Sequence, residues 1–197
     1  MSDLRGALQA GDLMTLERYA RERAAFRTRV LEHKRPRTVA VGPNVTWVFE
    51  DRLTIQYQVQ EMLRIERIFE PEGIQEELDA YNPLIPDGGN WKATMMIEFP
   101  DAAERAAALA TLRGIEDLCY VEVADHGRST AIADEDVERE NAEKTSAVHW
   151  LRFELPAAAR AALRAGAAVA AGVDHPAYRH ETRLSSATVE SLARDFG

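Results

Sequence analysis

The sequence contains very little cysteine, since Cys119 is the single thiol among 197 residues. One thiol excludes an intrachain disulfide, and it excludes a zinc or iron–sulfur centre held only by cysteines of this chain. Hydrophobic runs are short, because no stretch approaches the roughly 18 apolar residues that a membrane span requires. The first residues carry an acid and lack the apolar stretch of a secretory signal. We therefore predict a cytoplasmic protein with no membrane partner.

The sequence also lacks the strong catalytic signatures. It has no Gly-x-Gly-x-x-Gly, no phosphate-binding Gly-x-x-x-x-Gly-Lys-Ser/Thr and no Gly-x-Ser-x-Gly. His180 and Glu181 begin like the zinc-protease helix, but Leu184 stands where the second zinc ligand belongs. Cys119 is in phase with Val121 on an expected strand, which favours a core thiol over a nucleophile.

Positive charge is scarce overall and gathers near the start. The net charge is −9, with +3 on residues 1–50 and −12 on the remainder. An acidic body repels polyphosphate, so we predict no nucleic-acid partner. The basic segment 18–37 admits two interpretations: a solvated helix face that pairs with the acidic body of its own fold, or a docking surface for an acidic partner or an anion.

What is present is an ordinary globular composition, with 46% hydrophobic and 29% charged residues. A chain of this length suits one domain over residues 1–197. In its first half, apolar spacing and breaker residues predict a helix over 12–33 that starts at Asp12, a hairpin of strands 38–41 and 45–49, a helix over 51–69 and a short helix over 74–82.

The second half alternates strands with helices. We expect strands over 91–99, 118–124, 128–133, 147–155 and 168–173, alanine-rich helices that start at Pro100 and Pro156, and a last helix over 186–195. The acidic segment 134–145 is interpreted as an exposed helix or a linker. These elements predict an α+β fold: two βαβ-like units form a ferredoxin-like α/β sandwich in 91–197, and the helices and β-hairpin of 1–90 are appended to it.

The helix over 51–69 is apolar on two sides, and Gln58 and Glu66 project among its apolar side chains. Buried polar groups need partners. Two interpretations of Glu66 stay open. It is a carboxylate neutralised by Arg52, Arg64 or Arg152, or it is a ligand, acid or base with a shifted pKa.

Two histidines extend the second interpretation. His149 lies on an expected strand, and His175 lies in a turn with Asp174. The Asp174 carboxylate can fix the tautomer or orientation of the His175 ring without itself binding the metal. Together with Glu66 they would form a His/His/carboxylate set, the ligand type used by zinc or non-haem iron. The alternative is that a backbone carbonyl satisfies His149 and local hydrogen bonds hold the turn.

Four separated stretches carry a family resemblance: QEMLRIERI at 60–68, YNPLIP at 81–86, SAVHWLRF at 146–153 and DHPAY at 174–178. The chain resembles, over residues 12–194, a bacterial family catalogued as domain of unknown function 3501. That family has no assigned biochemistry. Its members are often encoded near rubrerythrin-like and iron–sulfur oxidoreductase proteins, so the resemblance implies a redox protein partner and a role in redox or peroxide-stress metabolism. It also implies that Glu61, Glu66, His149 and His175 share a site.

Three functional hypotheses follow. The first is an accessory protein that binds a metal, a small ligand or a redox partner. The second is a metal-dependent or acid/base enzyme that acts on a small anionic substrate. The third is a structural adaptor that uses the basic N-terminal helix. The expected pocket residues are Arg52, Gln58, Glu61, Arg64, Glu66 and Tyr178.

Overall fold

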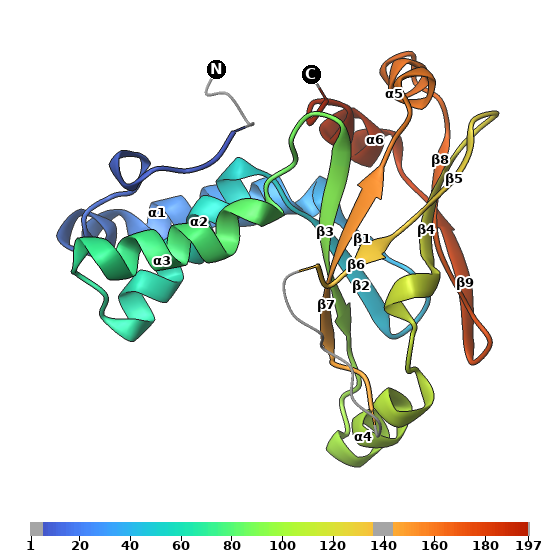
Figure 1. Cartoon of the computed structure of the whole chain (residues 1–197), viewed down its shortest axis with the longest axis horizontal. Helices are drawn as coiled ribbons and strands as arrows, with labels where there is room; N and C mark the ends of the chain where they lie inside the picture. Colours follow the sequence, from blue (N-terminus) through green and yellow to red (C-terminus); the bar gives the residue numbers. More distant parts are fainter. Residues whose placement is uncertain (1–5, 136–143, 197) are drawn as a thin grey trace.

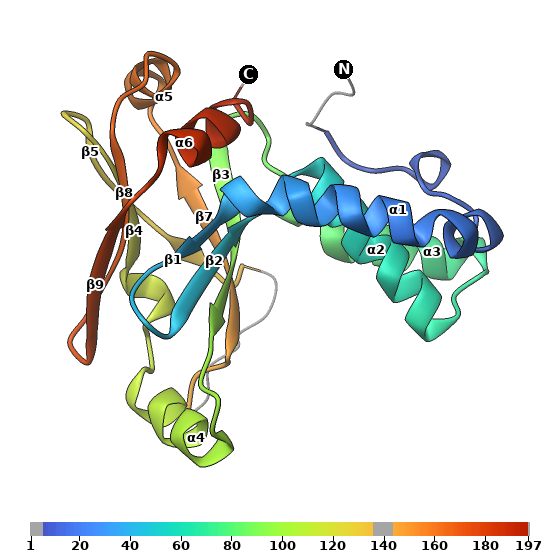
Figure 2. The ribbon, with the colours of Figure 1, turned by 180° about the vertical axis from the view of Figure 1, so that it is seen from behind.

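The computed structural model describes residues 6–135 and 144–196. A helical arm projects to one side of a unit made of two antiparallel β-sheets (Figure 1). The arm contains α1 (Leu16–Lys34), α2 (Arg52–Glu66) and α3 (Pro71–Tyr81), with the short 3-10 helices η1 (Ala10–Asp12), η2 (Arg35–Arg37) and η3 (Asn82–Leu84) at its turns. Figure 2 shows the same separation of arm and sheets from behind.

The strand order of the first sheet is β1-β2-β3-β7-β6, and that of the second is β5-β4-β8-β9. The strands of the first sheet are β1 (Thr38–Ala40), β2 (Val45–Phe49), β3 (Asn90–Ile97), β6 (Ile132–Ala133) and β7 (Val148–Glu154). Those of the second are β4 (Cys119–Val123), β5 (Gly127–Thr130), β8 (Val169–His175) and β9 (Tyr178–Arg183). The remaining helices are α4 (Ala102–Thr111), η4 (Glu116–Leu118), α5 (Ala157–Arg164) and α6 (Ser186–Ala193).

The predicted α+β class is confirmed, but the ferredoxin-like arrangement is corrected. The strands on either side of α4, β3 and β4, lie in different sheets, and so do β7 and β8 on either side of α5. A βαβ unit would place both strands in one sheet. The physical reason lies in the strands, which bury alternate residues and therefore need an apolar partner on one face only. A second sheet supplies that partner, and α4 buries only Leu109.

The main core lies between the two sheets. Trp47, Trp91 and Phe153 from the first sheet are fully buried, and the rings of Trp47 and Phe153 stack with centroids 5.4 Å apart. Each large buried side chain contributes about 1.5 to 3 kcal/mol to the hydrophobic stabilisation. Cys119 is buried in the same core, and burial raises the pKa of its thiol well above the ordinary value. The predicted core thiol is therefore confirmed.

The arm has its own smaller cores. Tyr19 and Phe26 of α1 pack edge-to-face with ring centroids 6.1 Å apart, and Val59 of α2 packs in a second cluster with Leu78 of α3. Helix α1 begins later than predicted, because Thr15 is its N-cap and accepts a hydrogen bond from the Arg18 amide. An acceptor at this position satisfies one of the unpaired amides of the first turn.

The last turn of α2 differs from the prediction. The helix ends at Glu66, and Arg67 follows in the left-handed conformation with φ of 55°. Ile65 and Phe69, two apolar residues of the helix predicted over 51–69, are 56% and 64% exposed. Glu66 is exposed as well, which corrects the prediction of a buried carboxylate. Helices α1 and α3 both pack against α2, but the last turn of α2 extends beyond them (Figure 1).

The hairpin predicted at 38–49 is confirmed, and β2 pairs with β3. Residues of the first half therefore complete the first sheet, so the hairpin is part of the two-sheet unit and not of the helical arm. Strand β9 was not predicted, and it pairs with β8. Of the acidic segment 134–145, residues 136–143 lie outside the described part. No helix among the described residues has both the length and the apolar character needed to cross a membrane.

Candidate metal centre

Three ligand-bearing side chains meet at the edge of the core between the sheets. Glu116 comes from η4, Asp134 follows β6, and His149 lies on β7. One potential ligand atom from each lies within 4.8 Å of the other two, and within residues 6–135 and 144–196 this is the one such group of three. Segments far apart in the sequence therefore build a single histidine–carboxylate cluster.

The strand pattern places His149 in the core. It alternates with Leu151 and Phe153 on the buried face of β7, and its side chain is fully buried. Asp134 is held against the same strand, because its amide donates to the Trp150 carbonyl and its Oδ1 accepts from the Trp150 amide, both at 2.9 Å. Asp134 adopts a positive φ of 47°, a conformation in which aspartate is tolerated better than bulky residues.

Hydrogen bonds orient the His149 ring. Nδ1 lies 2.6 Å from Asp134 Oδ2, and a carboxylate only accepts, so Nδ1 carries the hydrogen. The other nitrogen, Nε2, lies 2.9 Å from Thr145 Oγ1, 3.0 Å from the Ser146 carbonyl and 3.9 Å from Glu116 Oε2. Oxygen atoms therefore surround Nε2, and the Thr145 hydroxyl also donates toward Glu116 at 3.4 Å.

The electrostatics favour positive charge at this nitrogen. Burial disfavours the charged imidazole and is the largest single influence, but the Asp134 hydrogen bond and the charge of Glu116 outweigh it, so the pKa of His149 is raised above its ordinary value. The side chains of Glu116 and Asp134 are each 9% exposed, so water screens their charges little. A proton or a metal ion on Nε2 would serve the same electrostatic need.

The donor set suits a divalent metal. Imidazole nitrogen with carboxylate oxygen is a ligand combination used by zinc and by iron. Nε2 of His149 and the Glu116 carboxylate would be the ligands, and Asp134 would fix the ring through Nδ1, as outer carboxylates do for metal-binding histidines. This geometry gives Asp134 the orienting part that the sequence suggested for Asp174.

The structure does not assemble the predicted set of Glu66, His149 and His175, because no such group lies within 4.8 Å. Glu66 is exposed on the arm. His175 is buried at the end of β8, where Nε2 contacts the Arg113 carbonyl at 3.1 Å and Nδ1 accepts from the Ala177 amide at 3.2 Å. These are the local hydrogen bonds of the alternative interpretation.

Asp174 does not orient His175 in the described contacts. Its Oδ1 accepts from Arg179 Nε at 2.6 Å across the β8–β9 hairpin, where both side chains are largely exposed. Arg152, proposed as a partner of Glu66, instead pairs with Glu135 at 2.7 Å and with Glu154. Arg152 therefore does not neutralise Glu66, as one interpretation of the sequence had expected.

The expected pocket residues of α2 contribute to the packing of the arm. Arg52 pairs with Asp12 at 2.7 Å. Glu61 accepts two hydrogen bonds from Arg23 at 2.7 Å, and it also accepts from Tyr19 and Arg64. The Arg23 contact, against a smaller cost of burial, lowers the pKa of Glu61 to about 2. Glu61 is thus a structural carboxylate that ties α2 to α1.

The two remaining pocket candidates lie apart. Gln58 is half-buried on α2, while the fully buried amide of that helix is Gln60, which bonds the Met14 backbone in both directions. Tyr178 begins β9, and its hydroxyl donates to the Val41 carbonyl and accepts from the Asn44 amide. Tyr178 therefore holds the β1–β2 turn against the second sheet.

Sequence reasoning found His149 but missed Glu116, Asp134 and Thr145. Glu116 belongs to an acidic pair after Gly114, and Asp134 opens a run of acids that the composition assigned to a solvated segment. The available signal was the position of Asp134 next to an expected strand end. Only the pairing of β6 with β7 brings it to His149.

The fold and this cluster define an α+β protein with a buried histidine–carboxylate centre. The chain belongs to the family described as Protein of unknown function (DUF3501), which matches residues 7–196 and confirms the resemblance found in the sequence. A solved structure described as a novel protein of unknown function from Burkholderia pseudomallei K96243 is similar, with 50% identity and a TM-score of 0.93. The match covers 98% of this chain and 100% of that chain. No curated protein matches.

Proposed function

We propose that this protein binds a divalent metal ion, zinc or iron, at Glu116 and His149, with Asp134 as the positioning residue. The observation that carries the proposal is the environment of His149 Nε2, which faces a carboxylate, a hydroxyl and a carbonyl oxygen within 3.9 Å in a buried site. A neutral imidazole would turn its lone pair toward those oxygens, so a cation at Nε2, whether a proton or a metal ion, stabilises the arrangement, and a metal ion would have to displace the proton.

Burial favours binding over turnover at this site. His149 is fully buried, Thr145 is 1% exposed and Glu116 is 7% exposed, so a substrate molecule does not reach the site. A single ion needs only ligand atoms that lie close together, and those of the cluster lie within 4.8 Å of one another. We therefore favour the accessory binding protein over the enzyme that acts on a small anionic substrate. A metal here would also connect η4 to β7 and would stabilise the fold.

The test is metal titration of protein purified without a His-tag and stripped with a chelator. We expect one zinc or ferrous ion per chain, measured by elemental analysis after gel filtration, and a rise in Tm that saturates with metal. Glu116→Gln and His149→Gln should abolish stoichiometric binding. Asp134→Asn should weaken binding about 10- to 100-fold, because it frees the imidazole ring.

The controls remove similar groups outside the cluster. His126→Ala and Asp117→Asn each change an exposed residue and should leave the metal content and the Tm rise unchanged. Stoichiometric metal in the Glu116→Gln and His149→Gln variants, or none in the wild-type protein, would contradict the proposal.

Two further roles have less structural support than metal binding. A rubrerythrin-like or iron–sulfur oxidoreductase partner, and with it a role in bacterial redox or peroxide-stress metabolism, is a proposal supported by the family resemblance alone. The adaptor hypothesis is supported by the basic face of α1, although part of that face is used internally. Arg23 pairs with Glu61, and Arg18 pairs with Glu22 on the same helix.

A further inference from the structure

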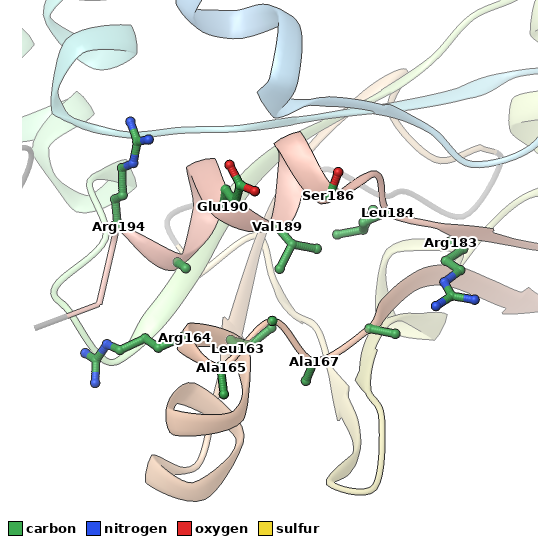
Figure 3. A pocket seen from close by; sticks show the side chains of 13 residues that line it. Leu163, Arg164, Ala165, Ala167, Arg183, Leu184, Ser186, Val189, Glu190 and Arg194 are labelled. Atoms are coloured by element: carbon green, nitrogen blue, oxygen red, sulfur yellow. The ribbon is translucent and has the colours of Figure 1, made fainter.

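A wide cleft lies between α6 and the turn that joins α5 to β8 (Figure 3). Its volume is about 690 Å³. Figure 3 shows that the guanidinium groups of Arg164 and Arg194 point away from the cleft and from each other. A ligand site needs polar groups that converge on one molecule, so these side chains do not form one.

A much smaller cavity lies where α3 and η3 meet the outer face of the first sheet. Its volume is about 60 Å³. Ala80, Pro83 and Leu84 line it on the side of the arm, and Lys92 of β3 and Trp150 of β7 line it on the side of the sheet. None of the residues of the histidine–carboxylate cluster lines this cavity, so it is a separate feature.

Lysine is rare in this chain, and one of the few lysines lines the cavity. The chain contains three lysines, Lys34, Lys92 and Lys144, among 24 lysine and arginine residues. A guanidinium group stays charged in proteins, whereas a lysine amine can lose its proton and act as a nucleophile. Position 92 therefore carries the basic side chain that is able to react.

The contacts of Lys92 leave its charge poorly compensated. Arg152 lies directly opposite Lys92 on β7, and like charges at such positions repel each other. Glu135 and Glu154 hold the Arg152 guanidinium. Lys92 Nζ instead donates to the Pro83 carbonyl, and no carboxylate in the described part of the chain lies within ion-pair distance of it.

The electrostatics favour the neutral amine accordingly. Burial lowers the pKa of Lys92 below its ordinary value, and the charge of Arg152 adds to this effect. The carboxylates of Asp87, Glu135 and Glu154 act in the opposite direction but do not cancel it. A desolvated lysine beside another cation is an arrangement that activates an amine for addition to a carbonyl group.

We propose that Lys92 binds a small aldehyde in this cavity as a reversible imine. The amine nitrogen attacks the carbonyl carbon, the two hydrogens of the neutral amine leave with the carbonyl oxygen as water, and a C=N double bond remains. No oxidant or reductant is needed. A water molecule needs about 10 to 15 Å³ of such volume, so the cavity accommodates about four non-hydrogen atoms. Leu84 and Trp150 would contact the carbon chain of the aldehyde.

The test uses the small number of lysines, because a peptide map distinguishes all three. The protein is incubated at pH 7 with propanal, which is of the right size, and cyanoborohydride traps the imine as a secondary amine. We expect Lys92 to be labelled about tenfold faster than Lys34 or Lys144, because the cavity holds the aldehyde beside the amine. The bulky 2-naphthaldehyde does not fit the cavity and should show no such preference.

Substitutions separate the cavity from the general reactivity of lysine. Ala80→Leu fills the cavity without changing the amine and should reduce the rate at Lys92 to that at Lys34. Ala107→Leu adds the same atoms at an exposed position on α4 and should leave the preference unchanged. If Ala80→Leu proves unstable in a thermal melt, the comparison of the two aldehydes on the wild-type protein decides.

Three results would overturn the proposal. They are equal labelling of the three lysines by propanal, an equal preference for Lys92 with 2-naphthaldehyde, and an unchanged preference in folded Ala80→Leu protein.

Discussion

At the scale of single residues, close contacts decide which side chains the fold accepts. Gly42 has a positive φ of 78° in the β1–β2 turn, and a Cβ atom there would lie 2.5 Å from His180 Cγ and 2.6 Å from the Tyr178 hydroxyl. The rings of Tyr178 and His180 pack with centroids 4.5 Å apart. The turn therefore needs glycine both for its conformation and for the space that the second sheet occupies.

We predict that Gly42→Ala lowers the free energy of unfolding by about 2 to 4 kcal/mol, because a strained φ and a steric overlap add. Gly114→Ala is the matched control. Gly114 has a φ of 74°, but no atom lies within 4 Å of its added Cβ, so the cost should fall to about 1 kcal/mol. Urea unfolding followed by circular dichroism measures both, and equal losses would show that the contact with His180 is unimportant.

At the scale of elements, ion pairs fix the helices of the arm. Glu61 on α2 is 13% exposed and accepts from Tyr19 and Arg23, whereas the pair of Arg18 and Glu22 on α1 is about half exposed. Exposed pairs contribute little because water screens them. The stability of the arm should therefore depend on Glu61 and hardly at all on Glu22.

We predict that Glu61→Gln destabilises the protein by about 1 to 2 kcal/mol at pH 7. Because the pKa of Glu61 is lowered to about 2, its carboxylate stabilises the folded state above its unfolded pKa of 4.5. That contribution disappears as the pH falls from 4.5 to about 2. The difference between wild-type and Glu61→Gln protein should thus close over this window in thermal melts. Glu22→Gln should show a much smaller pH dependence, because water screens the exposed pair that Glu22 forms with Arg18.

At the scale of the whole molecule, one buried arginine joins the arm to the sheets. Arg37, at the end of η2, is fully buried and pairs with Asp195 at 2.6 Å and with Asp51 at 3.7 Å. It also donates to the carbonyls of Phe49 and Glu50. Asp51 is the N-cap of α2, and Asp195 follows α6, so the arginine connects both parts of the molecule.

We predict that Arg37→Met costs about 3 to 5 kcal/mol, because it leaves the buried carboxylate of Asp195 without its cation, while Asp51 keeps its contact with His33 at 2.5 Å. The loss should speed hydrogen exchange in both α1 and α6. The double variant Arg37→Met/Asp195→Asn should recover part of the stability, since the stranded charge is removed. A loss of stability below about 1 kcal/mol would mean that apolar packing, and not Arg37, holds the arm against the sheets.

The sequence by itself determined the local elements. The period of apolar residues predicted α1, α2 and most strands, and Gly42 predicted the β1–β2 turn, because these signals act between neighbours in the chain. It also placed His149 and Cys119 on buried strand faces. The family followed from four stretches that the chain carries in order.

Only the tertiary structure decided the rest. Whether β3 and β4 share a sheet depends on what covers each strand face, which periodicity does not record. The exposure of Glu66 depends on where α1 and α3 stop covering α2. The partners of His149 became visible only in the folded chain, because the pairing of β6 with β7 brings Asp134, and the packing of η4 against β6 brings Glu116, to a ring that lies 15 and 33 residues further along the chain. A buried polar site is a long-range contact, and its chemistry is fixed by which segments meet.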